Sequence, residues 1–177
     1  VALCCGVIFS VTPFGQRVND AIDRGLAWFR ANQVGDGSIG PSAEEATGLA
    51  VLCFLEKRAS ADQNAAQVGF QGMDAADQAL VQRAVVYMLA NEPGINGSGA
   101  YQYRTGSALM ALSVYLLTGG PDMAGGPFSV RQGIANGVNA IVSTQGNFGS
   151  NMGGWNYNAP EGDGDLSTTQ FAMAGLS

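Results

Sequence analysis

Few side chains in this chain could do chemistry, because its 177 residues include no histidine. The absence excludes Ser-His-Asp triads, Cys-His pairs and histidine-ligated metals within this sequence. The three cysteines offer no framework in their place. Cys4 and Cys5 lie in an apolar run, and Cys53 lies in an apolar stretch that predicts a buried, inert thiol. We therefore predict no metal site and no cofactor.

Two aspartates separated by one glycine, Asp163 and Asp165, come directly before an apolar stretch at 166–176 that predicts a helix. A carboxylate in this place can accept the backbone N–H groups of the first helical turn, and its charge suits that end of the helix. We therefore interpret Asp165 first as an N-terminal cap.

The segment 147–165 is rich in asparagine, glycine and aspartate and carries two aromatic residues, Trp155 and Tyr157. Such a segment could bind calcium or the face of a sugar, but no EF-hand-like spacing supports calcium. We interpret the segment as an ordered surface loop, with Trp155 and Tyr157 as candidate ligand-binding residues.

The composition predicts a folded domain, since 46% of the residues are apolar and 12% are charged. The net charge of -6 argues against nucleic acid and anionic membrane surfaces, because both select for lysine and arginine. The 26 glycines have no collagen-like period, which is typical of turns and close backbone contacts.

The elements that would position these residues alternate between two kinds of helix. Amphipathic helices are predicted at 18–30, 74–90 and 130–144. Each is followed by a helix that is apolar on every side, at 46–55, 105–117 and 166–176. The chain therefore divides into three helical hairpins, at about 18–58, 74–118 and 130–177. The links between them, at 59–72 and 119–129, are predicted to be surface loops.

The hairpins share a residue pattern with a period of roughly 50 residues. A mid-helix position is held by Trp28, Tyr87 and Ala140. A helix-closing position is held by Gln33, Glu92 and Gln145, and the residue after the turn is Ile39, Tyr101 and Trp155. The apolar helices share a second repeated pattern. Each has a threonine, at 47, 105 and 169, with small residues nearby that would let helices pack closely.

A helix that is apolar on every side must be covered on every side, so the alternation implies two layers with the apolar helices inside. Three hairpins in a line would leave the inner helices exposed on one flank. The chain also stops at Ser177, within the third apolar helix. We therefore expect an all-α fold, an α/α toroid of which these residues form about half a ring.

Seven residues of the first hairpin resemble the QW repeat of terpenoid cyclases and the related protein prenyltransferases: Arg24, Gly25, Trp28, Phe29, Gln33, Gly37 and Ile39. The match departs at Phe29, where an aliphatic residue is usual, and at Ile39, where tryptophan is usual. The run 153–172 is similar to bacterial proteins with prenyltransferase/squalene-oxidase-type repeats.

The resemblance implies an α/α toroid whose inner helices line a central cavity. It also implies structural roles for the repeat residues Trp28, Gln33, Tyr87, Gln145 and Trp155. In this role the amide satisfies backbone groups at a helix end and the aromatic ring packs over the junction. If the Trp28 ring is buried, Trp28→Ala would cost about 3–5 kcal/mol.

Squalene–hopene-type cyclases, which belong to this family, protonate an alkene with an aspartic acid in a DxDD motif. The nearest match here is Asp163-Gly164-Asp165-Leu166, with leucine in place of the last aspartate. The resemblance thus makes Asp165, with Asp163, a candidate catalytic acid beside the cap interpretation. Prenyltransferases of this fold hold zinc with aspartate, cysteine and histidine, and these residues cannot complete such a site without histidine.

Three functions stay open at this point. The first is a toroid repeat protein without a catalytic site, which binds an isoprenoid or other apolar small molecule, or a protein partner. The second is a class II terpene cyclase that uses an aspartic acid, and the third is a carbohydrate-active enzyme on a similar barrel of helices. Because the inner helices would be uncovered, we also expect self-association.

Residues 2–14 are similar to the apolar part of a signal peptide. They are too few for a membrane span and lack a charged leading region, so an ordinary apolar first segment is the alternative. We expect residues 1–15 to be an export signal or anchor remnant and residues 16–177 to be an exported toroid domain in the periplasm, the cell envelope or the medium.

Overall fold

The computed structural model describes residues 13–40, 43–62, 64–149, 152–158 and 164–177. Within these ranges the chain is all-helical, with no strand beyond two isolated bridges, which confirms the predicted all-α class. The helices, in chain order, are α1 (Pro13–Ala31), α2 (Ala43–Leu55), α3 (Gly69–Gly72), α4 (Ala75–Asn91), α5 (Gln102–Leu117), α6 (Val130–Ser143) and α7 (Leu166–Leu176).

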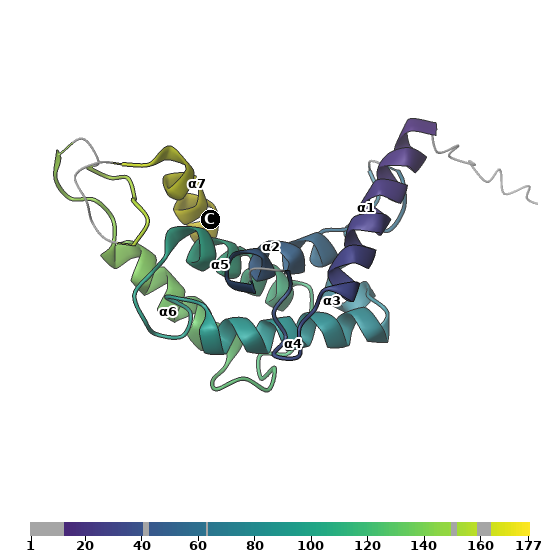
Figure 1. The fold of residues 1–177 in the computed structure, drawn as a ribbon, viewed down its shortest axis with the longest axis horizontal. Coiled ribbons are helices and arrows are strands. Elements are labelled where there is room, and N and C mark those ends of the chain that lie inside the picture. The colour runs from purple at the N-terminus through teal and green to yellow at the C-terminus, as the bar shows by residue number, and fades with distance from the viewer. Residues whose placement is uncertain (1–12, 41–42, 63, 150–151, 159–163) are drawn as a thin grey trace, which may run out of the picture.

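The long helices form two rows (Figure 1). The three apolar helices α2, α5 and α7 pack side by side with α5 in the middle, while α4 lies against α2 and α6 lies against α5. Helix α1 lies at one end of the molecule, where it contacts α2 and pairs Arg30 with Asp77 of α4, and α7 lies at the other end. The predicted alternation of amphipathic and apolar helices therefore produces two layers.

Small residues set the distance between the apolar helices. A Cβ atom added at Gly48 would lie 2.8 Å from the backbone of Ser107, and one added at Gly106 would lie 2.3 Å from the backbone oxygen of Phe171. Both distances are shorter than any normal contact, so only glycine fits at these positions. The predicted role of the small residues in close helix packing is confirmed.

The core is largest around α5, because α2 and α7 pack on its two sides and α6 also packs against it. Its Leu109, Leu112 and Tyr115 are fully buried, together with Val85 and Met88 of α4. Close packing of this kind is what makes core substitutions costly. The centre of the molecule is therefore its second hairpin.

The structure departs from the predicted elements in two places. The link 59–72, predicted as a surface loop, ends in the one-turn helix α3, whose Phe70 is buried and meets Tyr115 edge to face at 4.8 Å. Helix α5 begins at Gln102, three residues before the predicted start. The local residue pattern does not show that a single aromatic in a polar link reaches the core.

Two burial predictions for the first hairpin are wrong. The Trp28 ring is 48% exposed, because α1 has few neighbours, and Cys53 is exposed on α2. The pKa of the Cys53 thiol is nevertheless raised, first by partial desolvation and then by Glu56, which agrees with an inert thiol.

The predicted N-terminal export segment overlaps the described structure only at its end. Helix α1 begins at Pro13, and residues 1–12 lie outside the described residues. No helix in the described ranges has both the length and the apolar character needed to cross a membrane. Export stays a prediction.

Candidate functional site

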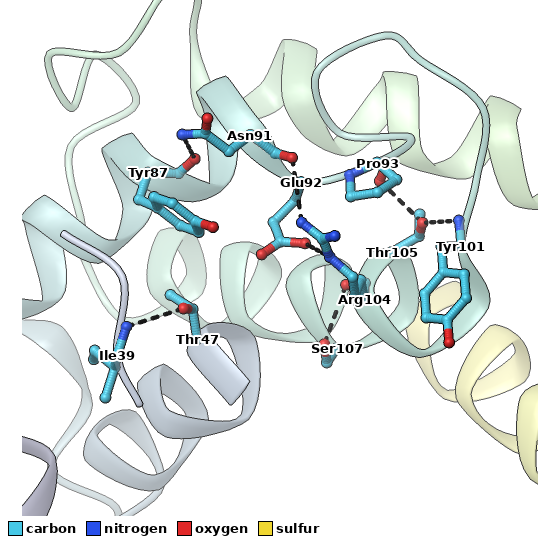
Figure 2. Close-up of polar contacts among 10 residues, drawn as sticks. All are labelled: Ile39, Thr47, Tyr87, Asn91, Glu92, Pro93, Tyr101, Arg104, Thr105 and Ser107. Carbon is cyan, nitrogen blue, oxygen red and sulfur yellow. Dashed lines mark hydrogen bonds and ion pairs between the residues drawn. The ribbon is translucent and has the colours of Figure 1, made fainter. Parts of the chain in front are cut away.

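In each hairpin the residue after the turn is hydrogen-bonded to the repeated threonine of the apolar helix. The backbone N–H of the residue after the turn donates to the threonine hydroxyl in all three hairpins. The pairs are Ile39 with Thr47 at 3.1 Å, Tyr101 with Thr105 at 3.0 Å and Trp155 with Thr169 at 3.0 Å. Figure 2 shows the first two of these bonds. We call this contact the threonine anchor.

The helix-closing glutamine of the first hairpin joins two hairpins. The Gln33 side-chain amide donates to the carbonyl oxygens of Gly37 at 3.0 Å and of Leu80, on α4, at 2.9 Å. Its oxygen accepts hydrogen bonds from the Arg83 guanidinium. Gln145 repeats the first of these contacts, donating to the carbonyl of Gly153 at 2.8 Å. These contacts agree with the predicted structural role of the glutamines.

The second hairpin replaces the glutamine by an acid and adds a base. The Glu92 carboxylate, 2% exposed, accepts from the Arg104 guanidinium at 2.8 Å (Figure 2). Arg104 lies beside Thr105, so the pair connects the end of α4 to the first turn of α5. A buried carboxylate needs such a partner, since an unpaired buried charge is strongly destabilising.

Trp155 is a structural residue by its contacts. Its ring is buried, its indole N–H donates to the carbonyl of Ile141 at 2.8 Å, and its own carbonyl accepts from Thr168 at 2.8 Å. The ring thus joins the loop to α6 and the backbone joins it to α7. Nothing in this environment offers the ring to a ligand, although the sequence made Trp155 a candidate for both roles.

Tyr157 belongs to a group of rings near the N-terminal ends of α5 and α7, which we call the tyrosine cluster: Tyr101, Tyr103, Tyr157 and Phe171. Tyr103 meets Phe171 edge to face at 5.0 Å between centroids and lies 5.8 Å from Tyr157, which lies 6.1 Å from Tyr101. The backbone N–H of Gln102 donates to the carbonyl of Tyr157 at 2.9 Å, which fixes the loop against α5.

The tyrosine cluster combines an apolar body with a polar end. Tyr157 is 44% exposed, and the Tyr103 hydroxyl is hydrogen-bonded to the Ser167 hydroxyl. The neighbouring Tyr103 phenol and, next, the Asp165 carboxylate raise the pKa of Tyr157, so its hydroxyl stays protonated at neutral pH. Such rings can stack on an apolar molecule while hydroxyl groups meet its polar end.

Asp165 is the N-terminal cap of α7, as predicted. Its carboxylate accepts from the backbone N–H of Thr168 at 2.9 Å and from the Ser167 hydroxyl at 2.5 Å. These hydrogen bonds, with Ser167 as the larger cause, lower the pKa of Asp165 below its usual value. A catalytic acid needs the opposite shift, so the geometry favours the cap over the acid. Asp163 lies outside the described residues.

A depression of about 370 Å³ lies between the turn 35–37 and α4, and its charged lining residues are Asp36 and Arg83. Both are engaged: Asp36 accepts from the hydroxyl and backbone N–H of Ser38, which lower its pKa, and Arg83 donates to Gln33. The lowered pKa keeps the Asp36 carboxylate ionised at neutral pH, so it is not a proton donor there.

The described residues contain no group of three side chains that could together hold a metal ion. Family models, curated proteins and solved structures were all compared with this chain, and none of them matches.

Sequence reasoning brought together some of these residues and missed others. Tyr157 was a candidate, but Tyr103 and Phe171 were not, although Tyr101 and Tyr103 are two residues apart at a helix start. That doublet was the available signal. What the sequence could not show is that the first turns of α5 and α7 lie side by side.

Proposed function

We propose that this chain belongs to an α/α toroid and that it binds an apolar small molecule with a polar end at the tyrosine cluster. Support for the toroid comes from the threonine anchor in all three hairpins and from the side-by-side packing of α2, α5 and α7. Each unit adds one inner helix beside the last, which is how a ring of hairpins would grow.

One observation carries the binding proposal: four rings converge near the N-terminal ends of α5 and α7, and one of them, Tyr157, is 44% exposed. Leu166 and Met173 on α7 are also exposed. A ligand with a hydrocarbon body and a hydroxyl end, such as an isoprenoid alcohol, matches these rings and the Tyr103 and Ser167 hydroxyls.

Titration with farnesol, an isoprenoid alcohol, followed by calorimetry and intrinsic fluorescence, tests this proposal. We expect saturable binding, and we expect Tyr157→Ala to weaken it about tenfold, since a lost aromatic contact removes about 1.4 kcal/mol. Phe148→Ala is the matched control, because Phe148 is an exposed aromatic residue outside the tyrosine cluster.

Other outcomes would favour the other functions. Saturable binding of maltose with no binding of farnesol would contradict the proposal and favour a carbohydrate ligand. A cyclised product from squalene, lost in Asp165→Asn, would favour the cyclase. Equal effects of Tyr157→Ala and Phe148→Ala would place farnesol elsewhere than the tyrosine cluster.

A further inference from the structure

The polar end of the tyrosine cluster is a row of three hydrogen-bonded side chains. The Tyr103 hydroxyl is hydrogen-bonded to the Ser167 hydroxyl, and the Ser167 hydroxyl donates to the Asp165 carboxylate at 2.5 Å. Tyr103 lies in the first turn of α5 and Ser167 in the first turn of α7, so the row crosses between the two helices. We call Tyr103, Ser167 and Asp165 the hydroxyl bridge.

The carboxylate at one end fixes the direction of each hydrogen bond in the hydroxyl bridge. Asp165 is ionised at neutral pH, because its pKa lies below the ordinary 3.8, and an ionised carboxylate can only accept hydrogen bonds. Ser167 has a single hydroxyl hydrogen, which it donates to Asp165. The hydrogen between Tyr103 and Ser167 must therefore come from the Tyr103 phenol.

The two hydroxyls consequently meet a ligand with lone pairs and without a hydrogen to donate. Both hydroxyl hydrogens are used inside the hydroxyl bridge, while the Tyr103 and Ser167 oxygens can each accept a further hydrogen bond. Ser167 is exposed and Tyr103 is partly exposed, so these oxygens are open to a molecule that lies on the rings. The missing hydrogen has to be supplied by that molecule.

The charge around the hydroxyl bridge favours the same kind of ligand. Residues 132–177 include three acidic residues and no lysine or arginine. On α5, the guanidinium of Arg104 is paired with the Glu92 carboxylate. An anionic group beside Ser167 would therefore be repelled by the Asp165 carboxylate, whereas a protonated amine would be attracted by it.

We infer that the tyrosine cluster selects ligands whose polar end is a hydrogen-bond donor, an alcohol or a protonated amine, over ends that only accept, such as an ether, a carboxylate or a phosphate. This inference rests on the proposed binding of an apolar molecule at the tyrosine cluster, and it assigns the specificity to Tyr103 and Ser167. A donor end satisfies their lone pairs, whereas an acceptor end places oxygen against oxygen. A site that hydrogen-bonds a hydroxyl group discriminates against analogues that lack it.

Farnesol and farnesyl methyl ether test the inference, because they share one hydrocarbon body and differ in the hydroxyl hydrogen. In calorimetric titrations we expect farnesol to bind about fivefold more tightly than the ether, the effect of one net hydrogen bond. Farnesylamine, which is protonated at neutral pH, should bind at least as tightly as farnesol. The titrations are repeated in Tyr157→Phe, which keeps the ring but removes a hydroxyl that can donate to the ether. The preference for farnesol should persist there.

A substitution within the hydroxyl bridge should change the preference rather than the overall binding. Ser167→Ala releases the Tyr103 hydrogen, which can then be donated to the ether oxygen. The ether should gain affinity, and the preference for farnesol should fall below about twofold. Ser143→Ala, at an exposed serine on α6, is the matched control and should keep the original preference.

The outcomes separate this inference from the proposed function. If farnesol and its ether bind equally, and Tyr157→Ala weakens both, the binding function stands and the donor specificity is overturned. A preference for farnesol that is unchanged in Ser167→Ala would also overturn it, since the hydroxyl bridge would not be its cause. If neither farnesol, its ether nor farnesylamine binds, both the proposed function and the inference are contradicted.

Discussion

Trp28 and Tyr87 hold the same position in successive hairpins, yet the first ring is 48% exposed and the second is 6% exposed. The two rings hold the same position of the repeat, but α4 is more apolar than α1 and buries far more of its residues. The neighbours also differ: α4 lies on α2, whereas no inner helix precedes α1 within the described residues. The same repeat residue is therefore a core residue in the interior hairpin and a surface residue at the edge.

The largest change in stability is expected at the buried ion pair of the second hairpin. Arg104→Met should lower the free energy of unfolding by about 3–5 kcal/mol, because it removes the guanidinium that pairs with the buried Glu92 carboxylate. Chemical denaturation measures the change. Arg24→Met, at the exposed edge, is the matched control and should change stability by less than about 0.5 kcal/mol.

A second substitution separates the ion pair from simple packing. Glu92→Gln restores the amide found at this position in the other hairpins and removes the buried charge. In that background Arg104→Met should cost much less. An equal loss in both backgrounds would mean that Arg104 stabilises the protein through its packing rather than through its charge.

The ring pair itself gives the next largest effect. Tyr87→Ala should cost about 3 kcal/mol, as expected for a buried aromatic residue, whereas Trp28→Ala should cost less than about 1 kcal/mol in dilute protein. Thermal and urea denaturation of both variants, compared at one low concentration, provide the measurement. Equal losses of stability at the two positions would contradict the assignment of Tyr87 to the core and of Trp28 to the surface.

The threonine anchor should be sensitive to burial in the same way. Thr105→Val removes a fully buried hydroxyl that accepts from the Tyr101 N–H and donates to the Pro93 carbonyl, and should cost about 1–3 kcal/mol. Thr169→Val, at a half-buried site, should cost less. The control variant Thr105→Ser keeps the hydroxyl and should retain most of the stability. A loss in Thr105→Ser as large as in Thr105→Val would assign the effect to the methyl group.

The smallest effect is expected at the exposed cap of α7. Hydrogen bonds lower the pKa of Asp165 in the folded chain below its ordinary 3.8, so its contribution is present above that pH and is lost as the pH falls through the folded-state pKa. Asp165→Ala should therefore lower the melting temperature at pH 7 and have no effect near the acid end of the titration. Asp165→Asn, which can still cap, should lose less at pH 7. A larger effect of Asp165→Ala at low pH than at pH 7 would contradict the cap.

Much of the fold could be predicted from the sequence, because helix periodicity and capping are local signals. Asp74, Ser129 and Asp165 each cap the helix that follows, and the ends of α4, α6 and α7 fall close to the predicted positions. The burial of Phe70 and the exposure of Trp28 were not predicted, because neither is a local property of the sequence. Their burial depends on which elements lie next to them in space, and a repeat pattern does not say which repeat lies at an edge.

The candidate site was only partly visible in the sequence. Tyr157 could be selected from its loop, and the cap at Asp165 from its place before a helix. The tyrosine cluster could not, since Tyr103 and Phe171 are 68 positions apart (171 minus 103) and meet only because α5 and α7 pack in parallel register at Gly106. That register depends on the absence of a side chain at one glycine.

The threonine anchor has a consequence for how this protein could vary. The two partners of the bond lie 8, 4 and 14 residues apart in successive hairpins, yet the bond length is nearly constant. Each doubling of such a loop costs only about 0.6 kcal/mol in chain entropy. Insertions between the turn and the inner helix can therefore accumulate while the frame keeps its geometry. In the third hairpin this tolerance accommodates the loop that brings Tyr157 to the tyrosine cluster.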